Sequence, residues 1–223
     1  MTTKKISIFF AVTSLVMAVP AFAYTISQSQ VFTGITNMSG SLPDFNQFDN
    51  HGDIWQLQSI QVSFTLQTSG GYLEIYNNSS SPASITFDFG TNGFIASTDV
   101  CLPDMSLQVY DGNHIELSNL GDSRSYDGGI KTNTKLVSIG ETFWNAGNKG
   151  FEGTGTYTID YSISQWFDWS GSGWIRFDSL PPNASSIVTV LYTYNETIPE
   201  PATIALLGTG ILVFLLKRKK KKR

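Results

Sequence analysis

The sequence is poor in the residues that disulfides and most catalytic sites need. Its 223 residues include one cysteine, Cys101, and two histidines, His51 and His114. A single cysteine excludes any disulfide within the chain, so the fold must be stabilised by its core. We expect Cys101, between Val100 and Leu102, to be a small apolar core residue rather than a reactive thiol.

Patterns for catalysis are equally scarce. The chain has no Gly-x-Ser-x-Gly motif, and His51 and His114 stand far apart in segments that we expect to be turns. Many carboxylates could supply the acid pair of a glycosidase, but the sequence does not show which two would meet. We predict that the protein is not an enzyme, with such a hydrolase as the alternative.

Positive charge is also scarce outside the two ends. Nine of the 14 cations lie in residues 1–23 and 217–223, which leaves five cations against 17 carboxylates in residues 24–198, a net charge of −12. Such a surface repels nucleic acid and anionic lipid, so neither is an expected partner of this region. Neutral sugars and divalent cations would be tolerated better.

One acidic loop offers the hard oxygen ligands that calcium prefers. Asp44, Asp49, Asn50 and Asp53 lie close in sequence, without the spacing of an EF-hand. Asp and Asn also favour tight turns without any ion. We favour turns and no cofactor, and keep calcium at Asp44, Asp49 and Asp53 as the alternative.

The N-terminus is typical of a signal peptide. Two lysines precede an apolar stretch over residues 6–19, and the small residues Ala21 and Ala23 follow it. We predict a signal peptide helix over residues 1–23, cleaved by signal peptidase so that the mature chain begins at Tyr24.

The C-terminus combines three features over residues 199–223. Pro199-Glu200-Pro201 precedes an uncharged apolar run over 202–216, and seven basic residues follow over 217–223. As a helix the run would span roughly 22 Å, which is short against a hydrocarbon core of about 30 Å. The basic end should stay in the cytoplasm and leave everything before Pro199 on the other side of the membrane.

This arrangement resembles the PEP-CTERM sorting signal of Gram-negative bacteria. The resemblance implies that an exosortase, a membrane-embedded enzyme, cuts near Pro199, Glu200 and Pro201. The two prolines keep the backbone around Glu200 extended, so we expect the enzyme to recognise Glu200. An ordinary single-pass anchor is the alternative.

Between the two ends the chain has the pattern of an all-β protein. Apolar residues alternate with polar ones over residues 60–66, 85–89, 153–167 and 186–194. Gly70-Gly71 predicts a hairpin that joins 60–66 to a strand over 72–76. Shorter apolar groups predict further strands, at residues 94–95, 107–110, 115–117 and 136–139.

Long antiparallel strands of this kind need two stacked sheets to bury their apolar faces. We therefore predict one antiparallel β-sandwich, jelly-roll-like, over residues 24–194. A linker over 195–198 would join it to the C-terminal transmembrane sorting helix.

The mature region is itself similar to a known domain. Leu42-Pro43-Asp44-Phe45-Asn46-Gln47-Phe48-Asp49, followed by residues 57–62, resembles the opening of the choice-of-anchor E domain of extracellular bacterial proteins. Residues 153–157 and 188–194 also suit that family. The glycine that usually precedes the strand is replaced here by Trp55-Gln56. The resemblance implies an extracellular location and a β fold, with no catalytic residues to transfer.

An aromatic segment over residues 166–174 is the strongest local hint of a ligand. Alternation places Trp166 and Trp174 on solvent-facing sides, and a hairpin at 171–173 would bring both to one surface with Asp168 and Arg176. Exposed indoles of this kind stack on sugar rings. The favoured interpretation is that they cover one end of the sandwich.

We therefore expect an exported protein of the cell envelope or extracellular polysaccharide matrix, held in the inner membrane until it is processed. Its partners would be signal peptidase, an exosortase-like enzyme and possible matrix polysaccharide, with the membrane contacted only through the sorting tail. A carbohydrate-binding module that uses the exposed tryptophans is the alternative.

Overall fold

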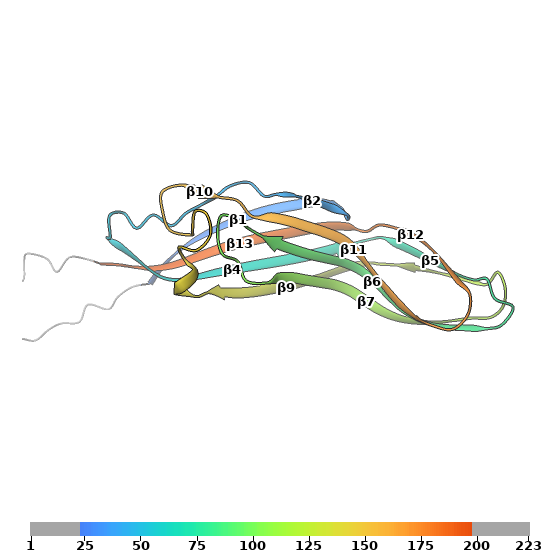
Figure 1. The fold of residues 1–223 in the computed structure, drawn as a ribbon. Helices are drawn as coiled ribbons and strands as arrows, with labels where there is room; N and C mark the ends of the chain where they lie inside the picture. The colour runs from blue at the N-terminus through green and yellow to red at the C-terminus, as the bar shows by residue number, and fades with distance from the viewer. Residues whose placement is uncertain (1–22, 198–223) are drawn as a thin grey trace, which may run out of the picture.

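The structure, a computed structural model, describes residues 23–197 as an elongated two-layered domain (Figure 1). Its one short 3-10 helix is η1 (Glu141–Phe143). Its strands are β1 (Ala23–Ile35), β2 (Met38–Ser41), β3 (Phe45–Asn46), β4 (Trp55–Ser69), β5 (Tyr72–Asn77), β6 (Ala83–Ala96), β7 (Met105–Leu117), β8 (Ser123–Asp127), β9 (Ile130–Ile139), β10 (Thr156–Tyr157), β11 (Asp160–Gly171), β12 (Ile175–Leu180) and β13 (Asn183–Glu196).

Two four-stranded antiparallel sheets form the body of the domain. One has the order β1-β13-β4-β9 and the other the order β2-β11-β6-β7. The division of eight strands between two facing sheets is that of a jelly roll. The all-β, antiparallel prediction is confirmed. Both predicted terminal helices lie outside the described residues, except for Ala23, which begins β1.

The core follows from alternation along the central strands. In β4, Ile60, Val62, Phe64 and Leu66 are fully buried, and the residues between them face outward. β13 repeats the pattern, and it continues through Glu196, two residues into the segment expected to be a linker. Each sheet therefore turns one apolar face inward, as the period of two requires.

A smaller sheet, β12-β5-β8, extends the first layer at the far end of the molecule (Figure 1). Its apolar face packs on the distal half of β6 and forms a second core around Phe87 and Phe89. The predicted hairpin at Gly70-Gly71 is wrong, because β5 pairs with β12 and β8 and not with β4. The two glycines, both with positive φ, instead interrupt one long line of strand.

Two of the segments that carry the choice-of-anchor E resemblance, residues 42–49 and 153–157, lie against each other. Leu42, Phe45 and Phe48 are buried in the main core. The Gln47 side chain accepts a hydrogen bond from the Gly155 N–H at 2.9 Å and donates to backbone carbonyls in residues 149–152. These motif residues therefore fix how the two loops pack.

Candidate functional site

Both ends of the described chain lie at one end of the sandwich. Ala23, the first residue of β1, is paired with Asn195 on β13. The Thr197 N–H donates to the Ile54 carbonyl at 2.7 Å, so the chain is held in place up to Thr197. Of the predicted processing residues, Ala21 and Pro199-Glu200-Pro201 lie outside the described residues.

The aromatic segment lies at the opposite end, where β11 passes to β12. Trp174 is 75% exposed and Trp169 is 42% exposed. Trp166 differs from the prediction because it is half-buried opposite Gly90, with its indole N–H buried and without a hydrogen-bond partner. Trp174 and Trp169, rather than Trp166, therefore present indole surface to solvent.

The predicted grouping of Trp166, Asp168, Trp174 and Arg176 on one surface is wrong. Residues 171–173 cross between the two layers and turn no hairpin, since β11 pairs with β2 and β6 while β12 pairs with β5. Phe167 and Phe177 face the core between the layers and contact each other. Asp168 directly follows Phe167, and Arg176 directly precedes Phe177. Both side chains therefore point outward, on opposite faces of the sandwich.

Arg176 is already engaged on its own face. Its guanidinium donates two hydrogen bonds to the Asp178 carboxylate, Nε to Oδ1 at 3.2 Å and a second from Nη2 to Oδ2. Its Cζ lies 5.2 Å from the centre of the Tyr76 ring. The Asp178 hydrogen bond raises the pKa of Arg176. This arginine is thus paired within its own layer.

Asp168 faces a carboxylate that the sequence did not single out. It is directly opposite Asp88 on β6, beside a small pocket of about 90 Å³ lined by Thr86, Phe87, Asp88, Asp168, Trp169 and Ser170. Among residues 23–197, no ion pair involves either carboxylate. Like charges so placed destabilise a sheet, and only the pairing register, which the sequence does not show, could have revealed them.

The histidines and the acidic loop show local pairing. His51 lies in a turn, but His114 lies on β7, so its predicted turn is wrong; its Nε2 is 2.8 Å from Glu116 Oε1. In the loop, Asp49 accepts the His51 N–H, and Asp53 accepts the Asn50 amide. These are turn interactions. The described residues contain no cluster of three or more His, Cys, Asp or Glu that could hold a metal. Asp44 lies apart and accepts from Thr156.

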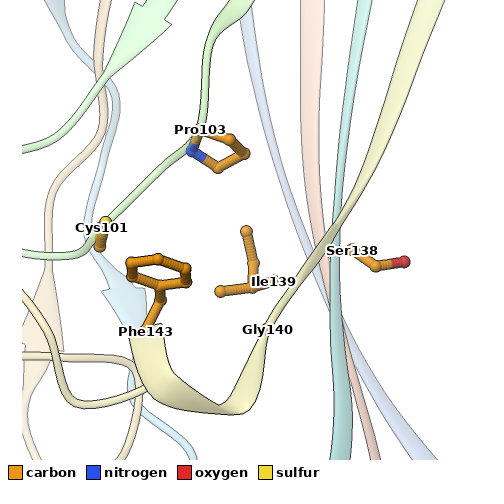
Figure 2. Close-up of a pocket in the computed structure, with 6 residues that line it drawn as sticks. All are labelled: Cys101, Pro103, Ser138, Ile139, Gly140 and Phe143. Carbon is orange, nitrogen blue, oxygen red and sulfur yellow. The ribbon is translucent and has the colours of Figure 1, made fainter.

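A second pocket, of about 150 Å³, lies where η1 follows β9. Figure 2 shows Phe143, Ile139, Pro103 and Cys101 around it, with Gly140 and Ser138 at its edge. Cys101 is only partly buried, at the wall of this pocket, instead of deep in the core as expected. The lining is almost wholly apolar, so the pocket offers volume without polar groups to orient a ligand.

The comparisons with known proteins identify the C-terminal tail. Residues 197–220 match the family model described as the PEP-CTERM protein-sorting motif. No curated protein matches the chain. The match covers the tail only, so the resemblance of residues 24–194 to the choice-of-anchor E domain stays a prediction.

Solved structures with a weak likeness are those of infectious bursal disease virus and its VP2 subviral particle. The Gx strain structure is 11% identical, with a TM-score of 0.19, over 91% of this chain and 49% of that chain. The VP2 subviral particle is also 11% identical, with a TM-score of 0.18, over 90% and 49%. The chain thus spans about half the length of these viral chains.

Within residues 23–197, no helix is long and apolar enough to cross a membrane. The predicted span over 202–216 lies outside that range. The motif at 197–220 supports an exported protein that an exosortase sorts, anchored transiently in the membrane before it is processed.

Proposed function

We propose that this protein is a non-enzymatic component of the cell envelope or of the extracellular polysaccharide matrix. The observation that carries the proposal is the PEP-CTERM motif over residues 197–220. The place of the motif supports it, because the motif begins where β13 ends and the folded domain is complete before it. Cleavage near Pro199 to Pro201 would release that domain whole.

The outer face of the first sheet supports a role in a hydrated, neutral matrix. The outward residues of β1, β13, β4 and β9 are Ser, Thr, Gln and a few aliphatic residues. None of the outward residues is charged over 25–35 in β1, 59–69 in β4, 130–138 in β9 and 185–193 in β13. Hydroxyl and amide groups of this kind hydrogen-bond to water and to sugars. We also propose, from the resemblance of its motifs, that the domain is of the choice-of-anchor E type.

Processing is tested by replacing Pro199, Glu200 and Pro201 with alanine in the native host. We expect the variant to stay in membranes at full length, while the wild-type protein is found shortened, with a new C-terminus near residue 199 by mass spectrometry. A matched variant with Thr203→Ala, inside the apolar run, should be processed normally. Equal processing of the triple variant, or a wild-type chain that is intact through Arg223, would refute the proposal.

A carbohydrate-binding role is the second candidate, and the exposure of Trp174 favours it. This indole lies at the end farthest from the tail, and its carbonyl is held by the Asn78 N–H at 2.8 Å. A held backbone would present the ring in a fixed place for stacking on a sugar. Binding on a glycan array that Trp174→Ala removes, and that Leu180→Ala keeps, would support this role. Unchanged binding in Trp174→Ala would contradict it.

A further inference from the structure

β1 forms an edge of the first sheet with no backbone partner on its outer side among residues 23–197. It pairs with β13 along its whole length, from Ala23 opposite Asn195 to Ile35 opposite Asn183, without a break in register. Its inner side is held firmly, because the Gln28 amide and the Asn46 backbone exchange two hydrogen bonds, at 2.9 and 2.7 Å. The edge is therefore long and continuous.

This edge lacks the features by which proteins protect edge strands from pairing. Such protection comes from charged side chains, proline, bulges or short length. β1 has 13 residues and contains neither a charged residue nor a proline. The other edge strands of the two four-stranded sheets and of the smaller sheet β12-β5-β8 are either short or charged. β2 has only four residues. The charged ones are β7 with Asp111 and Glu116, β9 with Lys131 and Lys135, β8 with Arg124 and Asp127, and β12 with Arg176 and Asp178.

We propose that β1 pairs with β1 of a second copy of this chain, antiparallel and around a two-fold axis near Ser29. The β1-β13-β4-β9 sheets of the two copies would then form one continuous sheet across the dimer. The backbone N–H and C=O groups on the outer sides of the two β1 strands would form hydrogen bonds with each other.

Charge leaves the edge of β1 as a place where a second copy can approach. The region between the two terminal segments carries a net charge of −12, so two copies repel each other over most of their surfaces. The edge of β1 and the outward residues beside it are uncharged, so two copies can approach there. Centred on Ser29, the pairing places Thr25 opposite Thr33 and Ser27 opposite Val31.

The hydroxyl pairs across that new junction repeat those already present on β1. Ser29 Oγ lies 2.8 Å from Thr189 Oγ1, and Thr33 Oγ1 lies 3.3 Å from Ser185 Oγ. Pairs of Thr and Ser across antiparallel strands stabilise a sheet, so the uncharged row of β1 suits a copy of itself.

The test measures the oligomeric state of residues 24–197 by analytical ultracentrifugation. All 13 strands and both cores lie within Ala23–Thr197, so this region should fold without the tail, which circular dichroism checks. We expect a dimer at concentrations up to about 100 µM, which covers interfaces at the weak, micromolar end. Val31→Lys should make the protein monomeric, because a lysine on an edge strand blocks pairing.

Leu136→Lys is the matched control. Leu136 is 61% exposed and Val31 is 58% exposed, both on the same face of the sheet but at opposite edges. The control should remain dimeric. A monomeric wild type would refute the proposal, and so would loss of the dimer in both variants, because that result would indicate association through the whole sheet face.

Single cysteines in a Cys101→Ser background test the direction of pairing. Antiparallel strands centred on Ser29 predict that Ser29→Cys forms a disulfide with its own copy, while Thr25→Cys and Thr33→Cys do not. Equal cross-linking at all three positions would show parallel strands. Either that result or no cross-link at Ser29 would contradict the antiparallel arrangement.

Discussion

Two fully buried tyrosines form a chain of hydrogen bonds whose disruption can be calculated. The hydroxyls of Tyr157 on β10 and Tyr192 on β13 lie 2.9 Å apart, and the Tyr192 hydroxyl donates to the Asn46 carbonyl at 3.2 Å. A hydroxyl has one hydrogen, so Tyr192 must accept the hydrogen bond that Tyr157 donates. The Asn46 carbonyl also accepts the Gln28 amide, so it does not depend on Tyr192 alone.

The two single substitutions should therefore differ. Tyr192→Phe leaves the buried Tyr157 hydroxyl without its acceptor, which costs about 1 to 3 kcal/mol, whereas Tyr157→Phe loses one hydrogen bond worth about 0.5 to 1.5 kcal/mol. At about 2 kcal/mol, Tyr192→Phe would lower Tm by about 4 to 8 °C in a domain of this size. Adding Tyr157→Phe removes the stranded hydroxyl, so the double variant should be more stable than Tyr192→Phe alone.

Urea denaturation of residues 24–197, followed by tryptophan fluorescence, gives the four free energies of unfolding for this cycle. Tyr110→Phe is the control, since Tyr110 is exposed and should change little. Strict additivity of Tyr157→Phe and Tyr192→Phe, or a larger cost for Tyr157→Phe, would refute the direction of the hydrogen-bond chain.

The same pair predicts a response to alkaline pH. Burial raises the pKa of both Tyr157 and Tyr192 above the ordinary value. The unfolded chain therefore releases these protons at lower pH than the folded chain does, so stability should fall as pH rises past about 10. Tyrosinate absorbance should show both groups ionising only on unfolding, and their titration in the folded protein near pH 10 would contradict their burial.

Two further outcomes follow from single sites. Gly90→Ala should destabilise the domain by about 1 to 3 kcal/mol, because its Cβ would lie 2.0 Å from the Val109 carbonyl oxygen. Gly140→Ala is the control, since its Cβ would have its nearest neighbour at 3.7 Å and the variant should unfold at the wild-type temperature. The Lys149 ammonium, and then the Thr158 backbone N–H, lower the pKa of Asp99. That lowering stabilises the fold above the unfolded pKa of about 3.9, and the effect is lost as pH falls below it. Asp99→Asn should thus lower Tm at neutral pH, and its Tm should fall less steeply than that of the wild type as pH is lowered. A variant whose Tm matches the wild type from neutral to acid pH would contradict this role of Asp99.

The sequence predicted the strands whose two faces differ. Residues 60–66 and 186–194 alternate cleanly because one face lies in the core and the other in solvent, and both lie within long strands of the structure. The tail was predictable for a different reason, since a motif, an apolar run and a basic end are local patterns that need no tertiary contacts.

The sequence could not show which strands pair. Gly70-Gly71 has the composition of a hairpin turn, yet the next strand continues forward because β12 and β8 supply its partners from far along the chain. The hairpin predicted at residues 171–173 was wrong for the same reason, because the sequence does not show strand pairing. For this reason too the sequence did not show that Asp88 and Asp168 lie opposite each other. Alternation gives the face of a residue within its strand but not the layer to which the strand belongs.

A second glycine pair, Gly128-Gly129, interrupts the neighbouring line of strand between β8 and β9. The two pairs exchange hydrogen bonds, from the Gly70 N–H to the Gly129 carbonyl at 2.8 Å and from the Gly128 N–H to the Gly71 carbonyl at 3.1 Å. This point separates the two cores, and the Phe89 ring lies against it.

Gly128→Ala and Gly129→Ala distinguish close packing from backbone conformation as the reason for these glycines. A Cβ on Gly128 would lie 2.4 Å from the Gly70 carbonyl oxygen, whereas one on Gly129 would meet nothing within 4 Å but would sit at a φ of +62°. Gly129→Ala should cost about 1 to 2 kcal/mol for the left-handed backbone alone, and Gly129→Asn less. Gly128→Ala should cost more than Gly129→Ala, because backbone atoms on both strands must move and the smaller sheet would shift from Phe89. Equal urea midpoints for Gly128→Ala and Gly129→Ala would show that the two strands can separate here without cost, and that the small sheet is not a rigid extension of the first layer.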